Sequence, residues 1–533
     1  ATIACGFDPT PLAVRRGRLA FNDAFASSSG TFACASCHPD GHTDQLLWRI
    51  GGECFLNGCV PGEDEVRSTM PIRGLRDTVP LHWDGILGDP FGGPNGATGI
   101  GGNEAPSCAA GDPQSCFRDL VDASLSGVMC DRTGACPPGG TILSEQEKDD
   151  MATFLERVSY PPARSRRIDD SVSMLGDGVV VTDPDGNNPI QVGALEGFAD
   201  FFLDQNGGGN PDTCADSNAG CHELPLGTAT NSETLQAFDA TTMRGMTDRF
   251  LQFSLGPVHT EELLTFANSG LPPVGISPLE TPIQWNPSQG FREITTFGAA
   301  FAVFEPVYGV RPLDIFQMFE EASTGPSGAL GRQVTLNSRT TGAARLAETD
   351  ALLAELEAAD ERGVVNLRGG GLRNGQAVTI SYVQATDQYR VGGATLARAA
   401  LIAEAQPPTP ILIATLTAHL RSGVSENSPQ PLIAPFGAQC DTGPNNPDPL
   451  IPGGSSFLFE GAHVADGDAV FLNGQDTGLT VSVTGTSSSC SATEGQITTQ
   501  LLSVSGLPRT GGLDLLQIRS ANGLLSNEMP LVP

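Results

Sequence analysis

The residues Cys34-Ala35-Ser36-Cys37-His38 place two thiols and an imidazole at a spacing that suits one chemical task. Two cysteines separated by two residues can add to the two vinyl groups on one porphyrin edge, and the adjacent histidine can reach the iron. The alternatives are a disulfide or half of a zinc site, but no second cysteine pair with zinc spacing follows. The motif therefore predicts a c-type haem attached to Cys34 and Cys37, with His38 as an axial ligand.

A second segment, from Cys214 to Cys221-His222, has the same residue types but six residues between its cysteines. Six residues can still place both sulfurs on one porphyrin if the additional residues bulge outward. Alternatively, only Cys221 forms a thioether and Cys214 pairs elsewhere, or the segment is a disulfide loop with an exposed histidine. We interpret it as a second haem site, with covalent links at Cys214 and Cys221 and with His222 as an axial ligand.

The stretches that follow the two motifs align with each other. Thr69–Asp77 and Thr242–Asp248 both contain Arg-Gly, and each is followed within about a dozen residues by a histidine, His82 or His259. An internal duplication of one haem-binding unit accounts for this pattern. It predicts His82 and His259 as distal iron ligands; the alternative is that they are ordinary exposed or core histidines.

Other side chains compete for places around the irons. The candidates are the methionines Met70, Met243 and Met246, the arginines Arg73, Arg76 and Arg244, the tryptophans Trp48 and Trp83, and the histidine His42. Thioether sulfur binds haem iron, and arginine can clamp a propionate in a bidentate pair. The alternatives are core packing for the methionines and tryptophans and solvated salt bridges for the arginines. His42 suits a propionate or solvent, and His419 and His463 are expected to be structural.

The elements that hold these residues can be predicted from periodicity. Helical spacing runs through Arg15–Phe25, and Ser144 with Glu147 forms a capping-box pattern that begins a helix ending near Val158. Further helices are expected over Ala194–Leu203 and over residues 343–362, and strand-like runs follow at Val378–Tyr382 and Tyr389–Val391. Alternating runs about ten residues apart between residues 456 and 518 predict a β-sandwich.

The 13 cysteines indicate an oxidising compartment. Apart from the haem candidates they pair by proximity in the sequence, as Cys54 with Cys59, Cys108 with Cys116, Cys130 with Cys136, and Cys440 with Cys490. Cys5 is left over, and it is free, bridges to another chain, or shows that one local pair is wrong. A secreted protein, extracellular or periplasmic, is therefore expected.

The formal net charge of -32 excludes nucleic acid and anionic membrane surfaces as favourable partners. No apolar run is long enough to span a membrane, and no signal peptide is visible, so we expect the mature form of an exported chain. Lys148 is the single lysine. The loop Asp183-Pro-Asp-Gly-Asn187 offers oxygen ligands that suit calcium, although an Asp-Gly turn explains it equally simply.

The first 330 or so residues resemble the bacterial diheme cytochrome c peroxidase superfamily. The likeness rests on the paired haem units, on Arg73-Gly-Leu-Arg-Asp77 and His82-Trp-Asp-Gly85, and on Phe154–Arg164, which resembles an inter-domain segment. The last 100 or so residues resemble an IPT/TIG-type immunoglobulin-like domain, through Pro452–Ser455 and Val470–Asn473. No residue matches the distal acid/base group of the peroxidases, and Glu104 is the nearest acidic candidate.

Together these observations predict a multidomain α + β protein. Residues 1–165 and 166–345 are expected to form two mainly α-helical cytochrome c-like haem domains, 346–432 a helix plus a β-rich region, and 433–533 an immunoglobulin-like β-sandwich. The expected function is electron transfer through two c-type haems to a redox partner protein or an extracellular acceptor. A peroxidase-like oxidoreductase, a subunit of an extracellular haem polymer, and a surface adhesion or structural protein are the alternatives.

Overall fold

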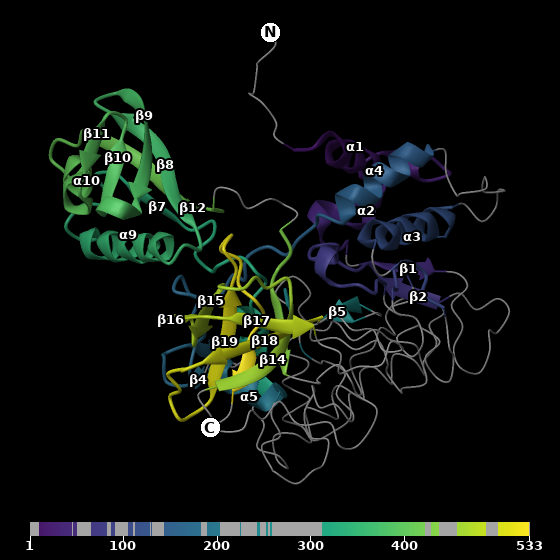
Figure 1. Cartoon of the computed structure of the whole chain (residues 1–533). Coiled ribbons are helices and arrows are strands. Elements are labelled where there is room, and N and C mark those ends of the chain that lie inside the picture. The colour runs from purple at the N-terminus through teal and green to yellow at the C-terminus, as the bar shows by residue number, and fades with distance from the viewer. Residues whose placement is uncertain are drawn as a thin grey trace.

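The computed structural model shows helical and β-rich parts joined into one molecule (Figure 1). It describes residues 10–44, 46–50, 65–82, 87–90, 105–109, 112–127, 129–130, 143–182, 189–202, 224, 242, 244–245, 252–253, 256–257, 312–421, 428–435, 456–486 and 499–531. Among these residues, no helix combines the length and the apolar character that crossing a membrane requires.

Short helices dominate the described residues of the N-terminal part, drawn in purple and blue in Figure 1. These helices are α1 (Leu12–Phe21), α2 (Cys34–Cys37), α3 (Pro113–Ser126) and α4 (Glu145–Leu155), with 3-10 turns at Ala24–Ala26, Pro39–Gly41 and Leu75–Asp77. A two-stranded sheet pairs β1 (Leu47–Ile50) with β2 (Glu65–Ser68). The buried side chains of this part form a core that includes Phe21, Phe117 and Met151.

The predicted capping box at the start of α4 is confirmed. The Ser144 hydroxyl accepts a hydrogen bond from the Glu147 amide at 3.3 Å, and the Glu147 carboxylate accepts one from the Ser144 amide at 2.8 Å. This reciprocal pair satisfies two amides that the helix itself leaves unbonded. α1 ends at Phe21, earlier than predicted, where the Asn22 side chain donates to the Arg18 carbonyl.

The second helical pair consists of α5 (Ala194–Phe202) and α8 (Pro312–Glu321). Two small hairpins accompany it, β3 (Val180–Thr182) with β4 (Pro189–Gln191) and β5 (Gln252–Phe253) with β6 (Gly256–Pro257). The predicted helix over Ala194–Leu203 is confirmed as α5, which ends one residue before the predicted end.

The two helix pairs cross in the same way. A Cβ atom on Gly17 of α1 would lie 2.5 Å from the Asp150 carbonyl carbon and 2.8 Å from the Phe154 Cβ of α4. A Cβ atom on Gly197 of α5 would lie 2.6 Å from the Asp314 carbonyl carbon and 2.9 Å from the Met318 Cβ of α8. Each glycine thus meets an aspartate and the residue four positions later, and only glycine allows this close approach.

Residues 333–419 form an antiparallel sheet of six strands in the order β11-β10-β9-β8-β12-β7. Its strands are β7 (Gln333–Leu336), β8 (Asn366–Arg373), β9 (Gln376–Val383), β10 (Gln388–Val391), β11 (Ala394–Leu396) and β12 (Leu412–His419), with a 3-10 turn at Gln384–Thr386. α9 (Leu346–Glu361) and α10 (Arg398–Ala405) cover one face, where Leu353 and Leu401 pack against Leu367 and Leu416. The predicted helix over 343–362 and the strands at 378–382 and 389–391 are confirmed.

Two four-stranded antiparallel sheets follow, in the orders β13-β14-β18-β17 and β16-β15-β19-β20. Their strands are β13 (Leu432–Pro435), β14 (Ser456–Ala462), β15 (Ala469–Leu472), β16 (Gln475–Thr480), β17 (Ser482–Thr486), β18 (Gln500–Ser505), β19 (Asp514–Arg519) and β20 (Met529–Leu531). β16 ends and β17 begins on either side of the buried residue Val481.

The sheets share their core with the second helix pair. Phe459 and Leu502 from one sheet, Val470 from the other, and Phe198 and Phe319 from α5 and α8 belong to one buried cluster. Figure 1 shows α5 lying directly beneath these strands. The α5–α8 pair therefore buries its apolar face against strands that are more than 100 residues distant in the sequence.

The expected fold class is wrong. We expected two mainly α-helical haem domains ahead of a small mixed region, but the described residues hold three antiparallel sheets of four or more strands beside short helices. The second helix pair belongs to a core that is largely β, which local periodicity could not show. The β-rich character expected for the C-terminal region is present. The domain limits at residues 165, 345 and 432 stay a prediction.

Candidate haem site

The two cysteines of the first motif lie on the single-turn helix α2, and both thiols are free. The Ser36 hydroxyl at the helix start accepts from the Ala33 amide at 3.0 Å, and the His38 amide donates to the Cys34 carbonyl at 3.0 Å. Cys34 packs against the N-terminal core. Two reduced thiols therefore stand one turn apart, with the imidazole directly after them.

Both thiols are held in the protonated form. Burial raises the pKa of Cys34 to about 12, and burial, supported by the charge of Asp44, raises the pKa of Cys37 to about 11. Metal binding and nucleophilic attack need the thiolate. Within the described residues, no group of three or more histidine, cysteine or acidic side chains could hold a metal ion.

His38 lies half-buried beside the first helix. Its ring centroid lies 6.2 Å from that of Phe21 in α1, and its Nδ1 atom is buried with no hydrogen-bond partner among the described residues. Burial lowers the pKa of His38, although the backbone of Met70 and the charge of Asp44 oppose the effect. The shift favours the neutral imidazole, which is the form that binds a metal.

The loop after His38 is fastened to the segment that was predicted to follow it. Asp40 and Gly41 both have positive φ angles, 53° and 75°. The Arg73 guanidinium donates twice to the Asp40 carbonyl, at 3.1 Å each, and the Ile72 amide donates to the Gly41 carbonyl at 3.0 Å. Arg73 thus holds the loop through a backbone carbonyl. Neither of its two predicted roles, a propionate clamp or a solvated salt bridge, included this contact.

Asp44 ties the end of this loop to two other segments. Its carboxylate accepts from Trp48 Nε1 and from Thr69 Oγ1, both at 2.8 Å. The Trp48 ring stacks on Phe32 with centroids 6.4 Å apart, so this tryptophan is packed at the edge of the motif. The motif, its loop and the segment 69–73 form one connected unit around α2.

Tyr160 connects the two halves of the duplicated pattern. Gly74 and Gly245, the glycines of the two Arg-Gly pairs, have positive φ angles of 84° and 67°, and a side chain on either would overlap the Tyr160 ring. The ring is 2% exposed, and the Arg244 guanidinium lies 5.7 Å from its centroid. Arg244 is itself buried and bonds to Gln430, so it is not a solvated salt bridge.

Several predicted site residues can be placed and others cannot. His82 is half-buried, with a positive φ angle of 80°, and follows Leu81, which bridges to Leu87. Met70 is half-buried, and Arg76 donates to the Ser428 carbonyl at 3.3 Å. The predicted site residues outside the described part are Cys214, Cys221, His222, His259, Met243, Met246, Trp83, Glu104 and 183–187. The distal ligands therefore stay a prediction.

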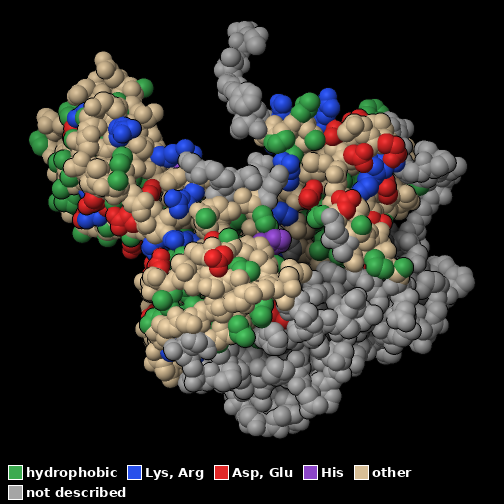
Figure 2. Space-filling view, viewed as in Figure 1, with side chains coloured by type: hydrophobic (Ala, Val, Ile, Leu, Met, Phe, Trp, Pro, Cys, Tyr) green, Lys and Arg blue, Asp and Glu red, His purple; other side chains and the backbone are tan. Residues whose placement is uncertain are grey.

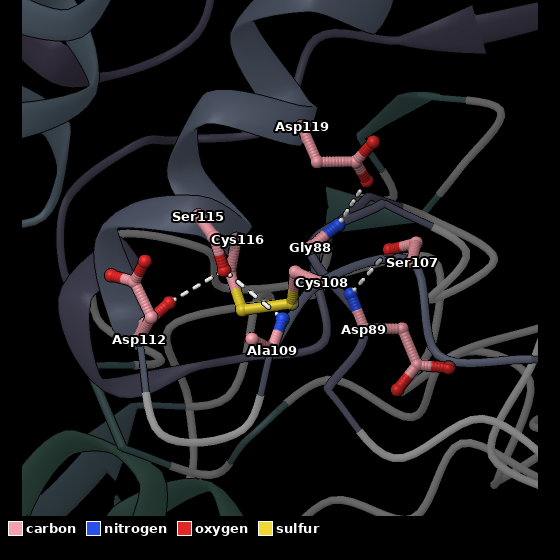
Figure 3. The surroundings of a disulfide bond; sticks show 9 residues. All are labelled: Gly88, Asp89, Ser107, Cys108, Ala109, Asp112, Ser115, Cys116 and Asp119. Carbon is pink, nitrogen blue, oxygen red and sulfur yellow. Dashed lines mark hydrogen bonds between the residues drawn. A yellow bond between two sulfur atoms is a disulfide. The ribbon is translucent and has the colours of Figure 1, made fainter.

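One predicted disulfide is confirmed, and Figure 3 shows its surroundings. Cys116 on α3 is bonded to Cys108, and the Ser115 hydroxyl beside it accepts from the Ala109 amide at 3.0 Å and donates to the Asp112 carbonyl. Cys130 is also disulfide-bonded. The remaining predicted partners, Cys136, Cys54, Cys59, Cys440 and Cys490, and the odd residue Cys5, lie outside the described residues.

The helix-crossing glycines and the tyrosine between the repeats were not predicted from the sequence motifs. A signal was present, because Gly17 and Phe21 have the same spacing as Gly197 and Phe201. Both phenylalanines are buried in the cores that these helices border. Tyr160 had no comparable signal, since its role depends on two turns that are 171 residues apart (245 − 74).

Comparison with known proteins adds one partial likeness. No protein-family model and no solved structure matches the chain. A curated protein, hydrazine synthase subunit gamma of Kuenenia stuttgartiensis, is 38% identical over 78 residues, which are 14% of this chain and 20% of that protein. The match spans about a fifth of that relative, so it covers one local segment of each protein.

Proposed function

We propose that this chain is a secreted c-type cytochrome that transfers electrons through two haems, one at Cys34, Cys37 and His38 and one in the related second half. The observation that carries the proposal is the state of the first motif. Two free thiols lie one helical turn apart, and the adjacent imidazole is half-buried, with a buried Nδ1 atom that has no hydrogen-bond partner among the described residues.

These residues fit a haem. The thiols would supply the covalent links, and His38 would supply an iron ligand. When bound, the haem supplies a one-electron redox centre. The chain's own contribution is positional: Arg73 and Asp44 hold the loop that orients His38, and Phe21 packs beside the imidazole.

The second haem rests on the repeat. Gly17 with Asp150 and Gly197 with Asp314 form equivalent helix crossings, and Gly74 and Gly245 approach one tyrosine ring. A duplicated scaffold that keeps both the crossing and the Arg-Gly turn supports a duplicated ligand site. Kinship with the diheme peroxidase superfamily, and an immunoglobulin-like origin for the two four-stranded sheets, belong to the same proposal.

Two further observations support the proposed compartment and the haem-related role. The disulfides at Cys108–Cys116 and Cys130 agree with an oxidising compartment, extracellular or periplasmic. The local likeness to a subunit of hydrazine synthase is in keeping with a haem-related role.

The test is haem content per chain, measured by alkaline pyridine spectra and by the mass of the denatured protein. We expect two covalent haems, a loss of one in Cys34→Ser/Cys37→Ser, and no loss in the control Cys108→Ser/Cys116→Ser. EPR of the oxidised protein then reports the axial ligands. One haem per chain would remove the second site, and a protein without covalent haem would refute the proposal.

A further inference from the structure

Helix α1 presents an apolar stripe bordered by arginines to solvent. Leu12 and Leu19, seven positions apart, are 52% and 72% exposed. On a helix these positions lie on one side, with Arg15 and Arg16 on the two flanks of the stripe. Both arginines are exposed, and so is Arg18 one turn further along the helix edge. We call this surface the α1 face: Leu12, Arg15, Arg16, Arg18 and Leu19.

The α1 face differs in charge from the rest of the molecule. The ten residues of α1 include three arginines and no acidic residue, in a chain with a net charge of -32. Arg16 and Arg18 form no ion pair within the described residues. Phe25, 59% exposed, adds apolar surface just beyond the helix. Figure 2 shows basic and hydrophobic side chains intermixed where α1 lies at the top of the molecule.

The residues of α5 that correspond to the α1 face can be identified from the repeat. Counting from the crossing glycines, Arg15 corresponds to Leu195 and Arg18 to Phe198. Leu195 packs against the core shared with the C-terminal sheets, and Phe198 is 3% exposed within it. Part of the equivalent surface of α5 is therefore covered by the chain itself, whereas the α1 face is exposed and carries arginines.

The α1 face also backs onto the proposed haem. Phe21, on the buried side of the same helix, has its ring 6.2 Å from that of His38. A molecule seated on the α1 face is thus separated from His38 by one helix, about 10 Å across. Exposed leucines between arginines are typical of an interface with an apolar centre and a charged surround.

We infer that the α1 face is the docking site for an electron-transfer protein with an acidic surface, which exchanges electrons with the haem proposed at Cys34, Cys37 and His38. This inference rests on the proposed function. Complementary charge steers such a partner and speeds its association, and the leucines add apolar contact in the docked complex.

The experiment uses a flavodoxin chosen for its net negative charge. Its Kd for the full chain is measured by calorimetry, and the second-order rate constant for reduction of the haem is measured by stopped flow at several salt concentrations. The variant Arg16→Glu/Arg18→Glu is compared with Arg339→Glu/Arg390→Glu, two exposed arginines on the six-stranded unit. Both variants change the net charge to -36 (-32 - 4), so long-range steering is matched.

We expect the α1 variant to weaken binding and to slow reduction about ten-fold at low salt, and the control to change either by less than about two-fold. Leu19→Ser should weaken binding at all salt concentrations, whereas Leu372→Ser, at a leucine on β8 that is 48% exposed, should not. Equal effects in the two arginine variants would overturn the inference.

A different failure would concern the proposed function alone. If no covalent haem is present, the calorimetric Kd still tests docking. Weaker binding in the α1 variant alone would then support the docking surface and refute the redox role. If light scattering shows self-association that only the α1 variant abolishes, the occupant is a second copy of this chain, and the inferred partner is wrong.

Discussion

The substitution Gly17→Ala separates helix propensity from helix packing. In an isolated helix, alanine is more favourable than glycine by about 1 kcal/mol. At the α1–α4 crossing, however, the new methyl group would lie 2.5 Å from the Asp150 carbonyl carbon and 2.8 Å from the Phe154 Cβ. Carbon atoms in contact need about 3.5 Å or more, so α1 must move away by about 1 Å.

This movement cannot be avoided by a change of rotamer, because the obstacle is the backbone of α4. Overpacking of a core costs about 1–3 kcal/mol, and a backbone obstacle places this site near the upper value. Because the gain in helix propensity offsets about 1 kcal/mol, we expect the free energy of unfolding to fall by about 2 kcal/mol. Displacement of Phe21 should also disturb His38, whose ring it contacts.

Hydrogen exchange read by mass spectrometry is the appropriate assay, because it reports the opening of each helix separately. Peptides from 12–21 and 145–155 should exchange about 30-fold faster, which corresponds to 2 kcal/mol, and those of α5 and α8 should not change. Gly197→Ala should show the reverse pattern. Gly393→Ala is the control, since no atom lies within 4 Å of its added Cβ. Unchanged or greater protection in Gly17→Ala would refute the packing argument.

Three further predictions concern other parts of the molecule. Arg166→Met should destabilise the protein by about 3–5 kcal/mol, because it leaves its buried partner Glu528 unpaired, and Arg166→Met/Glu528→Met should recover part of the loss in urea unfolding. Burial opposes ionisation of Asp514, but hydrogen bonds from neighbouring side chains outweigh it and lower its pKa. The ionised carboxylate therefore contributes fully to the free energy of unfolding above the unfolded pKa of about 4, and this contribution is lost as the pH falls through the lower folded pKa. Acid unfolding of Asp514→Asn should depend less on pH in this range. Removal of the disulfide by Cys108→Ser/Cys116→Ser should cost about 2.5 kcal/mol in thermal unfolding, the value for a closed loop of about nine residues, and an unchanged melting temperature would contradict this estimate.

The features that the sequence determined by itself are those decided within a few residues. The pair Ser144 and Glu147 specified the start of α4, and the short separation of Cys108 and Cys116 specified their disulfide. Cys34, Cys37 and His38 lie on one turn and the residue after it, so their common position follows from the backbone alone. The periodicity of residues 343–362 likewise identified α9.

The features that only the tertiary structure decided depend on residues far apart in the chain. Phe198 and Phe319 look like the core of a helical domain, but their partners are Phe459 and Val470 in sheets that complete the cluster. Local periodicity reports that a face is apolar, and it does not report what covers that face. For the same reason Tyr160 was not recognised: its environment exists only when Gly74 and Gly245, from two halves of a duplicated pattern, approach one ring. Glycine at positions 74 and 245 indicates that another group approaches the backbone closely, but only the fold identifies that group.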